Sequence, residues 1–96
     1  MYYDLRESGL RIKKLRQKAG LTQEMLAEQL NISWSMMAKI EIGNKGLSID
    51  LLIELAVVLN SSLDYIILGR DLHVDRLKTK LKEISVQLSE LENELT

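Results

Sequence analysis

The chain has 96 residues, with 13 basic and 14 acidic side chains and a formal net charge of -1. Its 46% hydrophobic content is typical of one small globular domain and excludes a disordered chain. It has no cysteine and one histidine, His73, which excludes a disulfide scaffold, a thiol nucleophile and a multi-histidine metal site, so we expect neither metal nor cofactor.

Two short amphipathic helices are predicted after an N-terminal arm over residues 1–8. The first follows the spacing of Leu10, Ile12 and Leu15 and stops at Gly20. Thr22 is expected to cap the second, at about residues 22–30. The residues that this second helix should bury are Leu26, Ala27 and Leu30. Asn31 follows, and because asparagine tolerates a left-handed conformation, we predict a tight turn there.

Three further helices are predicted, each preceded by a serine suited to an N-cap: Ser33, Ser48 and Ser62. The third spans about residues 33–42, before Gly43, and the fifth ends at Gly69. Their expected buried residues are Met37 and Ile40 of the third helix, Leu52, Leu55, Ala56 and Leu59 of the fourth, and Leu63, Ile66 and Ile67 of the fifth. No segment alternates as a strand does, so the predicted fold class is all-α.

The tail, residues 71–96, has a narrower apolar pattern. Its apolar residues are separated alternately by three and four positions, which is an a/d heptad register. We call them the seam residues: Val74, Leu77, Leu81, Ile84, Leu88, Leu91 and Leu95. A lone helix would expose this stripe to water, so we predict a coiled coil that holds a homodimer together. Folding of the stripe onto its own domain and binding to another protein are the alternatives.

The order of charges along the tail bears on the direction of this pairing. Lys78 and Lys80 flank the seam in its first half, and Glu92 and Glu94 flank it in its second half. Parallel chains would bring like charges together at each end. Antiparallel chains would place Lys78 near the partner's Glu92, and Lys80 near the partner's Glu94, so we favour the antiparallel arrangement.

The second and third helices have the properties of a helix-turn-helix motif. A small residue, Ala27, stands where the helices must cross closely, and Asn31 supplies the left-handed turn position. Apolar side chains are available to fill the angle between the helices: Leu26, Leu30, Ile32, Met37 and Ile40.

On these residues the chain resembles a known family. Residues 9–69 resemble the five-helix DNA-binding domain of the Xre family, which includes the Cro and lambdoid phage repressors, through segments 15–23, 23–30, 40–43 and 62–67. The chain departs from the family pattern at three places: Asn31 replaces the usual Gly, Gly46 with Leu47 stands where Pro is common, and Trp34 is unusually bulky. The resemblance implies a lambda-repressor-like domain followed by the long C-terminal helix.

The candidate DNA contacts lie on and around the third helix. A helix over residues 33–42 laid in the major groove would turn Ser35 and Lys39 toward base edges, with Trp34 at the flank. Packing of Trp34 over the corner between the second and third helices is the alternative. The candidate phosphate contacts are Gln23, Asn44 and Lys45. The resemblance also implies that Gln23 contacts the DNA backbone, and that Arg16 and Glu41 form a structural salt bridge.

Charge is distributed unevenly, with eight basic and five acidic side chains in residues 1–47 and one basic and four acidic in residues 48–71. A basic N-terminal half favours double-stranded DNA as partner. The sequence does not group a nucleophile with a base, or two carboxylates with a metal, so we do not expect an enzyme. We expect a sequence-specific transcriptional regulator, acting as a repressor and binding a palindromic operator as a dimer. The alternative is a helix-turn-helix protein-interaction module, antitoxin-like or anchoring.

No membrane or small-molecule partner is indicated by the sequence. The N-terminus lacks the basic and apolar regions of a signal peptide, and the longest apolar runs are far shorter than a membrane span. We therefore expect a cytoplasmic protein.

Overall fold

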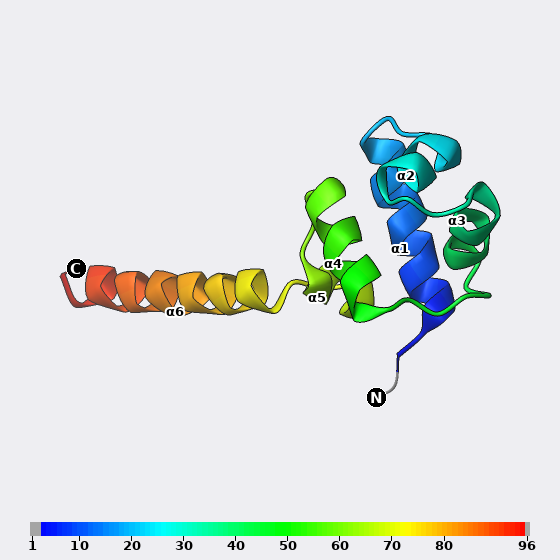
Figure 1. The fold of residues 1–96 in the computed structure, drawn as a ribbon. Helices are drawn as coiled ribbons and strands as arrows, with labels where there is room; N and C mark the ends of the chain where they lie inside the picture. The colour runs from blue at the N-terminus through cyan, green and yellow to red at the C-terminus, as the bar shows by residue number, and fades with distance from the viewer. Residues whose placement is uncertain (1–2, 96) are drawn as a thin grey trace.

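The computed structural model describes residues 3–95 and places six helices in this range (Figure 1). Their bounds are α1 (Leu5–Lys18), α2 (Gln23–Gln29), α3 (Trp34–Glu41), α4 (Ile49–Val58), α5 (Leu63–Leu68) and α6 (Leu72–Leu95). No strand occurs among the described residues, so the all-α fold class is confirmed. Residues 1 and 2 of the expected arm and residue 96 of the expected tail lie outside the described residues.

The helices begin where polar side chains cap them. The side chains of Thr22, Ser33, Ser48 and Ser62 each accept a hydrogen bond from the backbone N–H three residues later, as predicted. Asp4 caps α1 in the same manner, accepting from the backbone N–H groups of residues 6 and 7. These caps fix the starting points of α1 to α5 and therefore the loops between them.

The start of α1 corrects the sequence prediction. An arm over residues 1–8 was expected, but the chain is helical from Leu5, and Ser8 and Gly9 are buried. The physical reason is that this part of α1 packs through small residues against α3 and α5. Such a face of small residues has little hydrophobic periodicity. The sequence does carry another signal for this helix start, because the cap Asp4 and Glu7 three residues later resemble a capping box.

Eleven apolar residues from α1 to α5 and their helix ends form the core: Ile12, Leu26, Ala27, Leu30, Met37, Ile40, Leu51, Leu52, Leu55, Leu59 and Ile66. The predicted inward stripes of α2 and α3 are confirmed in this set. In α4 the core also takes Leu51, while Ala56 is only partly buried. In α5 the expectation for Leu63 was wrong, because it lies on the exposed side of this short helix.

Helix α5 is fastened to α1 by side chains that bind its last carbonyl groups. The Ser8 hydroxyl and the Arg11 Nε both donate to the carbonyl oxygen of Ile66, and Arg11 Nη2 donates to that of Ile67 at 3.0 Å. Carbonyl groups at a helix end have no partner within the helix, so these bonds satisfy them. The point from which the chain departs toward α6 is thereby fixed on α1.

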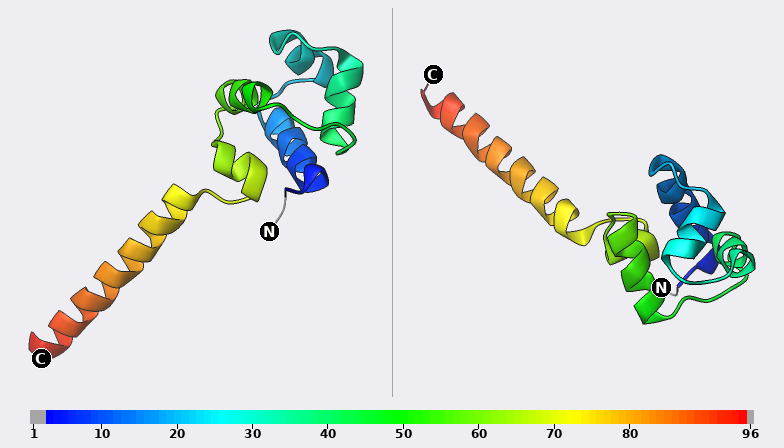
Figure 2. Two further views of the ribbon diagram at one scale, coloured as in Figure 1. Left: turned by 60° about the horizontal axis from the view of Figure 1, so that its bottom comes forward. Right: turned by 45° about the horizontal axis from the view of Figure 1, so that its top comes forward.

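Helix α6 projects away from the five-helix domain (Figures 1 and 2). The molecule is 65 Å long and 30 Å wide, and α6 contains no buried residue. The views in both figures place α3 on the side of the domain that faces away from α6. No helix in the described range is long and apolar enough to cross a membrane.

Candidate functional site

The turn between α2 and α3 holds these two helices against each other. Asn31 has a φ of 56°, in the left-handed region that the sequence predicted. The turn is closed by backbone hydrogen bonds from Asn31 to Glu28, 3.2 Å, and from Ile32 to Ala27, 3.0 Å. Since Leu26, Ala27 and Leu30 are all buried, the pair is a packed unit that presents α3 at the surface.

Helix α3 has one buried and one exposed side. Met37 and Ile40 are fully enclosed in the core. Trp34, Ser35 and Lys39 are exposed, and Trp34 keeps 57% of its surface in solvent. The three residues predicted to contact bases therefore lie on the surface of one helix, and a bound macromolecule could reach them.

Behind this surface lies a buried ion pair between α1 and α3. Arg16 Nε and Nη2 donate to the two carboxylate oxygens of Glu41, at 2.6 and 3.0 Å. The side chains are only 10% and 1% exposed, and Arg16 Nη1 also donates to the carbonyl oxygen of Leu21 at 2.8 Å. This bidentate geometry holds the C-terminal turn of α3 on α1, so the pair stabilises the orientation of α3.

Gln23 extends this hydrogen-bond network to the surface of α3. Its Nε2 donates to Glu41 Oε1 at 3.0 Å, and its Oε1 accepts from the indole Nε1 of Trp34 at 3.2 Å. The two alternatives for Trp34, DNA contact and packing at the corner between α2 and α3, are therefore compatible. The ring is bonded at that corner by its N–H, and the residue as a whole remains more than half exposed.

Gly9 allows α1 to approach the C-terminal end of α3 closely. A Cβ atom built at this position would lie 2.5 Å from the carbonyl oxygen of Glu41 and would also clash with that of Ile40. Only a residue without a side chain permits this contact. The position of α3 therefore depends on Gly9, a residue that the sequence analysis did not single out.

The loop after α3 carries the other two candidate phosphate contacts. Asn44 and Lys45 are exposed, and the Asn44 backbone N–H donates to the carbonyl oxygen of Lys39 at 2.9 Å. This bond closes the last turn of α3 and holds Asn44 at its end. Lys39 on α3 and Lys45 in this loop are therefore two exposed positive charges, one on α3 and one just after it.

Helix α6 starts at a capped turn. The carboxylate of Asp71 accepts hydrogen bonds from the backbone N–H groups of His73 and Val74, at 3.0 and 3.3 Å. The bond from Val74 is the main cause that lowers the pKa of Asp71 below its ordinary value of 3.8. Arg70 Nε pairs with Asp75 Oδ2 at 2.7 Å beside this cap.

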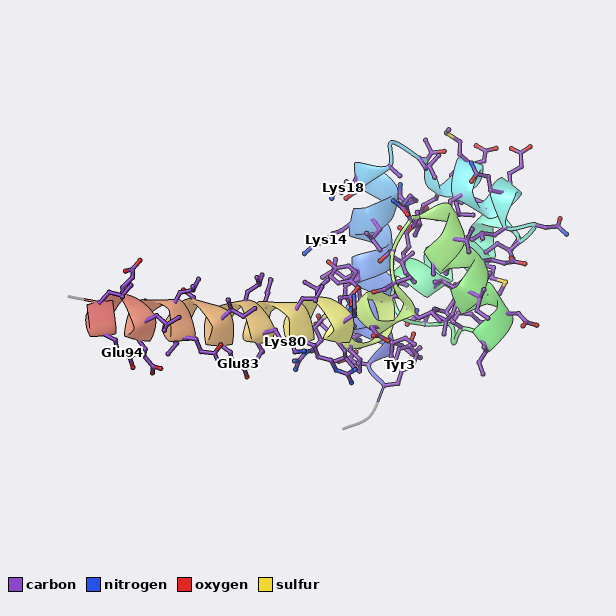
Figure 3. All side chains as sticks on the ribbon, turned by 90° about the vertical axis from the view of Figure 1, so that its left-hand side faces the viewer. Tyr3, Lys14, Lys18, Lys80, Glu83 and Glu94 are labelled. Atoms are coloured by element: carbon purple, nitrogen blue, oxygen red, sulfur yellow. The ribbon has the colours of Figure 1, made fainter. Side chains whose placement is uncertain are left out.

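The seam residues of α6 are all exposed, with between 41% and 87% of their surface in solvent. Figure 3 shows α6 side chains directed outward all along the helix, with Lys80 nearer the domain and Glu94 nearer the free end. The stripe does not fold back onto its own domain. No group of three or more metal-binding side chains comes together within residues 3–95.

Comparisons with known proteins agree with this geometry. A family profile described as "Helix-turn-helix" (HTH_3) matches residues 12–66. The HTH-type transcriptional regulator ImmR of Bacillus subtilis is 38% identical over 90 residues, which cover 92% of this chain and 70% of ImmR.

Two solved structures are similar in fold. The restriction-modification controller protein C.AhdI of Aeromonas hydrophila is 30% identical, with a TM-score of 0.62 over 66% of this chain and 96% of C.AhdI. SinR of Bacillus subtilis, a master regulator for biofilm formation solved in complex with DNA, is 30% identical, with a TM-score of 0.58 over 62% of this chain and 95% of that one.

Proposed function

This chain belongs to the helix-turn-helix family of Xre-type DNA-binding transcriptional regulators, which are not enzymes, and from that premise we propose that it is a sequence-specific repressor that binds a palindromic operator as a dimer. The observation that carries the proposal is the exposed side of α3, held in place by the buried Arg16–Glu41 pair and free to enter a groove. In this organisation residues 9–69 bind DNA and residues 71–96 join two chains.

We propose that α3 lies in the major groove and recognises the base sequence. Lys39 is the residue that can donate to guanine O6 and N7, and Ser35 can contact several bases. Trp34 lies in the first turn of α3, the part of a recognition helix that meets base edges. All three are exposed on the same helix, which supports their joint role.

The proposed phosphate contacts surround this helix. Asn44 and Lys45 follow α3, and Gln23 opens α2 beside it. Gln23 uses one amide hydrogen on Glu41, so its second one is available for a phosphate oxygen. Such contacts set the position of the protein on the duplex without selecting a sequence.

The dimer is proposed to form through the seam residues of α6. Their exposure in a single chain leaves a continuous apolar stripe that a second copy of α6 would cover. The separation of α3 and α6 on opposite sides of the domain supports the proposal, because pairing through α6 leaves α3 accessible.

The charge order along α6 favours an antiparallel pair, since the lysines lie nearer the domain and Glu92 and Glu94 nearer the free end. Such a pair places the two domains at opposite ends of a coil about 36 Å long. Because α3 faces away from α6, binding of both domains to one duplex then requires rotation at residues 69–71. Contacts with the operator can offset the free-energy cost of this rotation only if both domains bind the same duplex.

Repression follows from occupancy, since a dimer seated in two major grooves covers the DNA that other proteins need. The proposal is tested by selecting duplexes from a random pool with the purified chain and titrating salt against affinity. A palindromic consensus and a steep negative salt slope are expected. A slope near zero, with no enriched sequence, would contradict DNA recognition and favour the protein-interaction module.

The dimer is tested separately by deleting residues 72–96, since α6 (Leu72–Leu95) contains no buried residue. Sedimentation should show a monomer or a much weaker dimer, and far-UV circular dichroism should show that the five-helix domain remains folded. An unchanged mass would place the interface on α4 and α5 instead.

A further inference from the structure

Gln23 links a buried carboxylate to an exposed aromatic ring, and the chemistry of the two neighbours fixes its orientation. The carboxylate of Glu41 can only accept hydrogen bonds, and the indole N–H of Trp34 can only donate one. The Gln23 amide must therefore turn its nitrogen toward Glu41 and its oxygen toward Trp34, as the distances of 3.0 and 3.2 Å show. The opposite amide orientation would place its oxygen against the Glu41 carboxylate and its NH₂ group against the indole N–H of Trp34.

The orientation of the amide is anchored in the core. Glu41 is held by two bonds from Arg16, which itself donates to the carbonyl oxygen of Leu21, and the Glu41 side chain is only 1% exposed. The carboxylate thus cannot rotate away from Gln23 without leaving Arg16 uncompensated. Because Glu41 holds the amide nitrogen of Gln23 on the buried side, the amide oxygen of Gln23 is held as an acceptor on the exposed side.

The fixed orientation of the Gln23 amide determines which atoms of the Trp34 side chain a ligand can contact. The only polar atom of this side chain is already bonded within the protein, so the exposed indole ring can meet a ligand through carbon atoms alone. In the major groove, the one apolar group that a base pair presents is the C5-methyl group of thymine. A ring held in this manner favours thymine and gains no hydrogen bond from the other bases.

We propose that Gln23 is a positioning residue that keeps the indole N–H of Trp34 turned into the protein, so that the ring selects thymine by its methyl group. The DNA part of this inference rests on the proposed function. The positioning of Trp34 by Gln23 concerns the free protein and does not depend on it.

The positioning is tested by tryptophan fluorescence, because Trp34 is the only tryptophan in the chain. Gln23→Met keeps the side-chain length but removes both hydrogen bonds, while the Arg16–Glu41 pair stays in place to hold the fold. Time-resolved anisotropy of the full chain should show faster local motion of the indole than in wild type. Glu24→Gln, an exposed change on the same helix, should leave the anisotropy unchanged. Equal indole motion in wild type and Gln23→Met, with both chains folded by circular dichroism, would overturn the positioning role.

The thymine preference is tested on a duplex selected from a random pool with wild-type protein, with each thymine replaced in turn by uracil. Loss of one buried methyl group should weaken binding about fourfold at one position in each half-site. Trp34→Ala should remove this sensitivity and Gln23→Met should reduce it, whereas Ser35→Ala should retain it. A duplex that is bound with a steep salt slope but tolerates every uracil would overturn thymine selection and leave the proposed function intact. Absence of any salt-dependent duplex binding would overturn the proposed function itself.

Discussion

Replacing Glu41 by glutamine should destabilise the domain severely while barely changing its shape. In wild type, three N–H donors converge on the Glu41 carboxylate, two from Arg16 and one from Gln23. In Glu41→Gln, one of the two oxygens becomes an NH₂ group that faces a donor, and the Arg16 charge stays buried without its counter-charge. Breaking a buried pair in this manner costs about 3–5 kcal/mol.

The assay is urea unfolding followed by circular dichroism, with two ion pairs whose carboxylates are far less buried than that of Glu41 as controls. Arg70 and Asp75 lie at 2.7 Å, nearly the same distance as the buried pair, but their side chains are 61% and 36% exposed. Glu7 and Arg11 lie on α1 at 3.9 Å, with Glu7 exposed. Asp75→Asn and Glu7→Gln should each cost about 1 kcal/mol or less, because water screens exposed charges.

A double variant separates the value of the pair from the cost of breaking it. Arg16→Met with Glu41→Leu removes both charges, and its stability should recover most of the loss seen in Glu41→Gln. A cost for Glu41→Gln as small as that of the two controls would refute the structural role of the pair. A double variant as unstable as the sum of the single changes would refute the coupling between them.

Three further predictions concern other parts of the chain. Gly9→Ala should lower the free energy of unfolding by about 1–3 kcal/mol, because the added Cβ clashes with α3. Gly46→Ala, with nothing within 4 Å of its Cβ position, should be nearly neutral, and equal effects of the two changes in urea unfolding would contradict the close approach at Gly9. The lowered pKa of Asp71 means that its ionised form stabilises the start of α6. The wild type should therefore be more helical than Asp71→Ala at neutral pH, and this difference should shrink as the pH falls below 3.8 and through the lowered pKa. A difference in helicity that persists unchanged in stronger acid would exclude the cap as its cause. If α6 pairs antiparallel, Leu77→Cys and Leu95→Cys should form disulfides only when the two variants are mixed, whereas efficient cross-linking within each single variant would indicate parallel chains.

Much of the fold could be predicted because local signals and the hydrophobic pattern agree. The four caps at Thr22, Ser33, Ser48 and Ser62 form as predicted, and the left-handed turn at Asn31 follows from the tolerance of asparagine for positive φ. A second left-handed asparagine, Asn60 with a φ of 51°, was not foreseen.

The first turn of α1 could not be found from periodicity, because its buried face consists of Ser8 and Gly9. Small residues leave no apolar signal where helices touch most closely, and only the cap at Asp4 with Glu7 marks the start. The contact of Arg11 with the end of α5 spans 55 and 56 residues and depends on tertiary packing, so no local pattern reports it.

The Arg16–Glu41 pair that the resemblance implied is present, but the bonds from Gln23 to Glu41 and Trp34 were not predicted. The exposed side of α3 follows from its helical spacing once Met37 and Ile40 are assigned to the core. The bond between Gln23 and Trp34 requires two side-chain rotamers on different helices to agree, which a sequence does not encode locally. The roles of these residues on DNA stay predictions.

The most direct test of the account compares Lys39→Ala with Lys45→Ala on a selected duplex and on random duplex over a range of salt. If α3 recognises the bases, Lys39→Ala should lose about 1–3 kcal/mol on the selected duplex and relax the preference at one base-pair position. Lys45→Ala should weaken binding to both duplexes alike and reduce the salt slope by about 1. Equal losses for the two variants on both duplexes would contradict the assignment of α3 as the recognition helix.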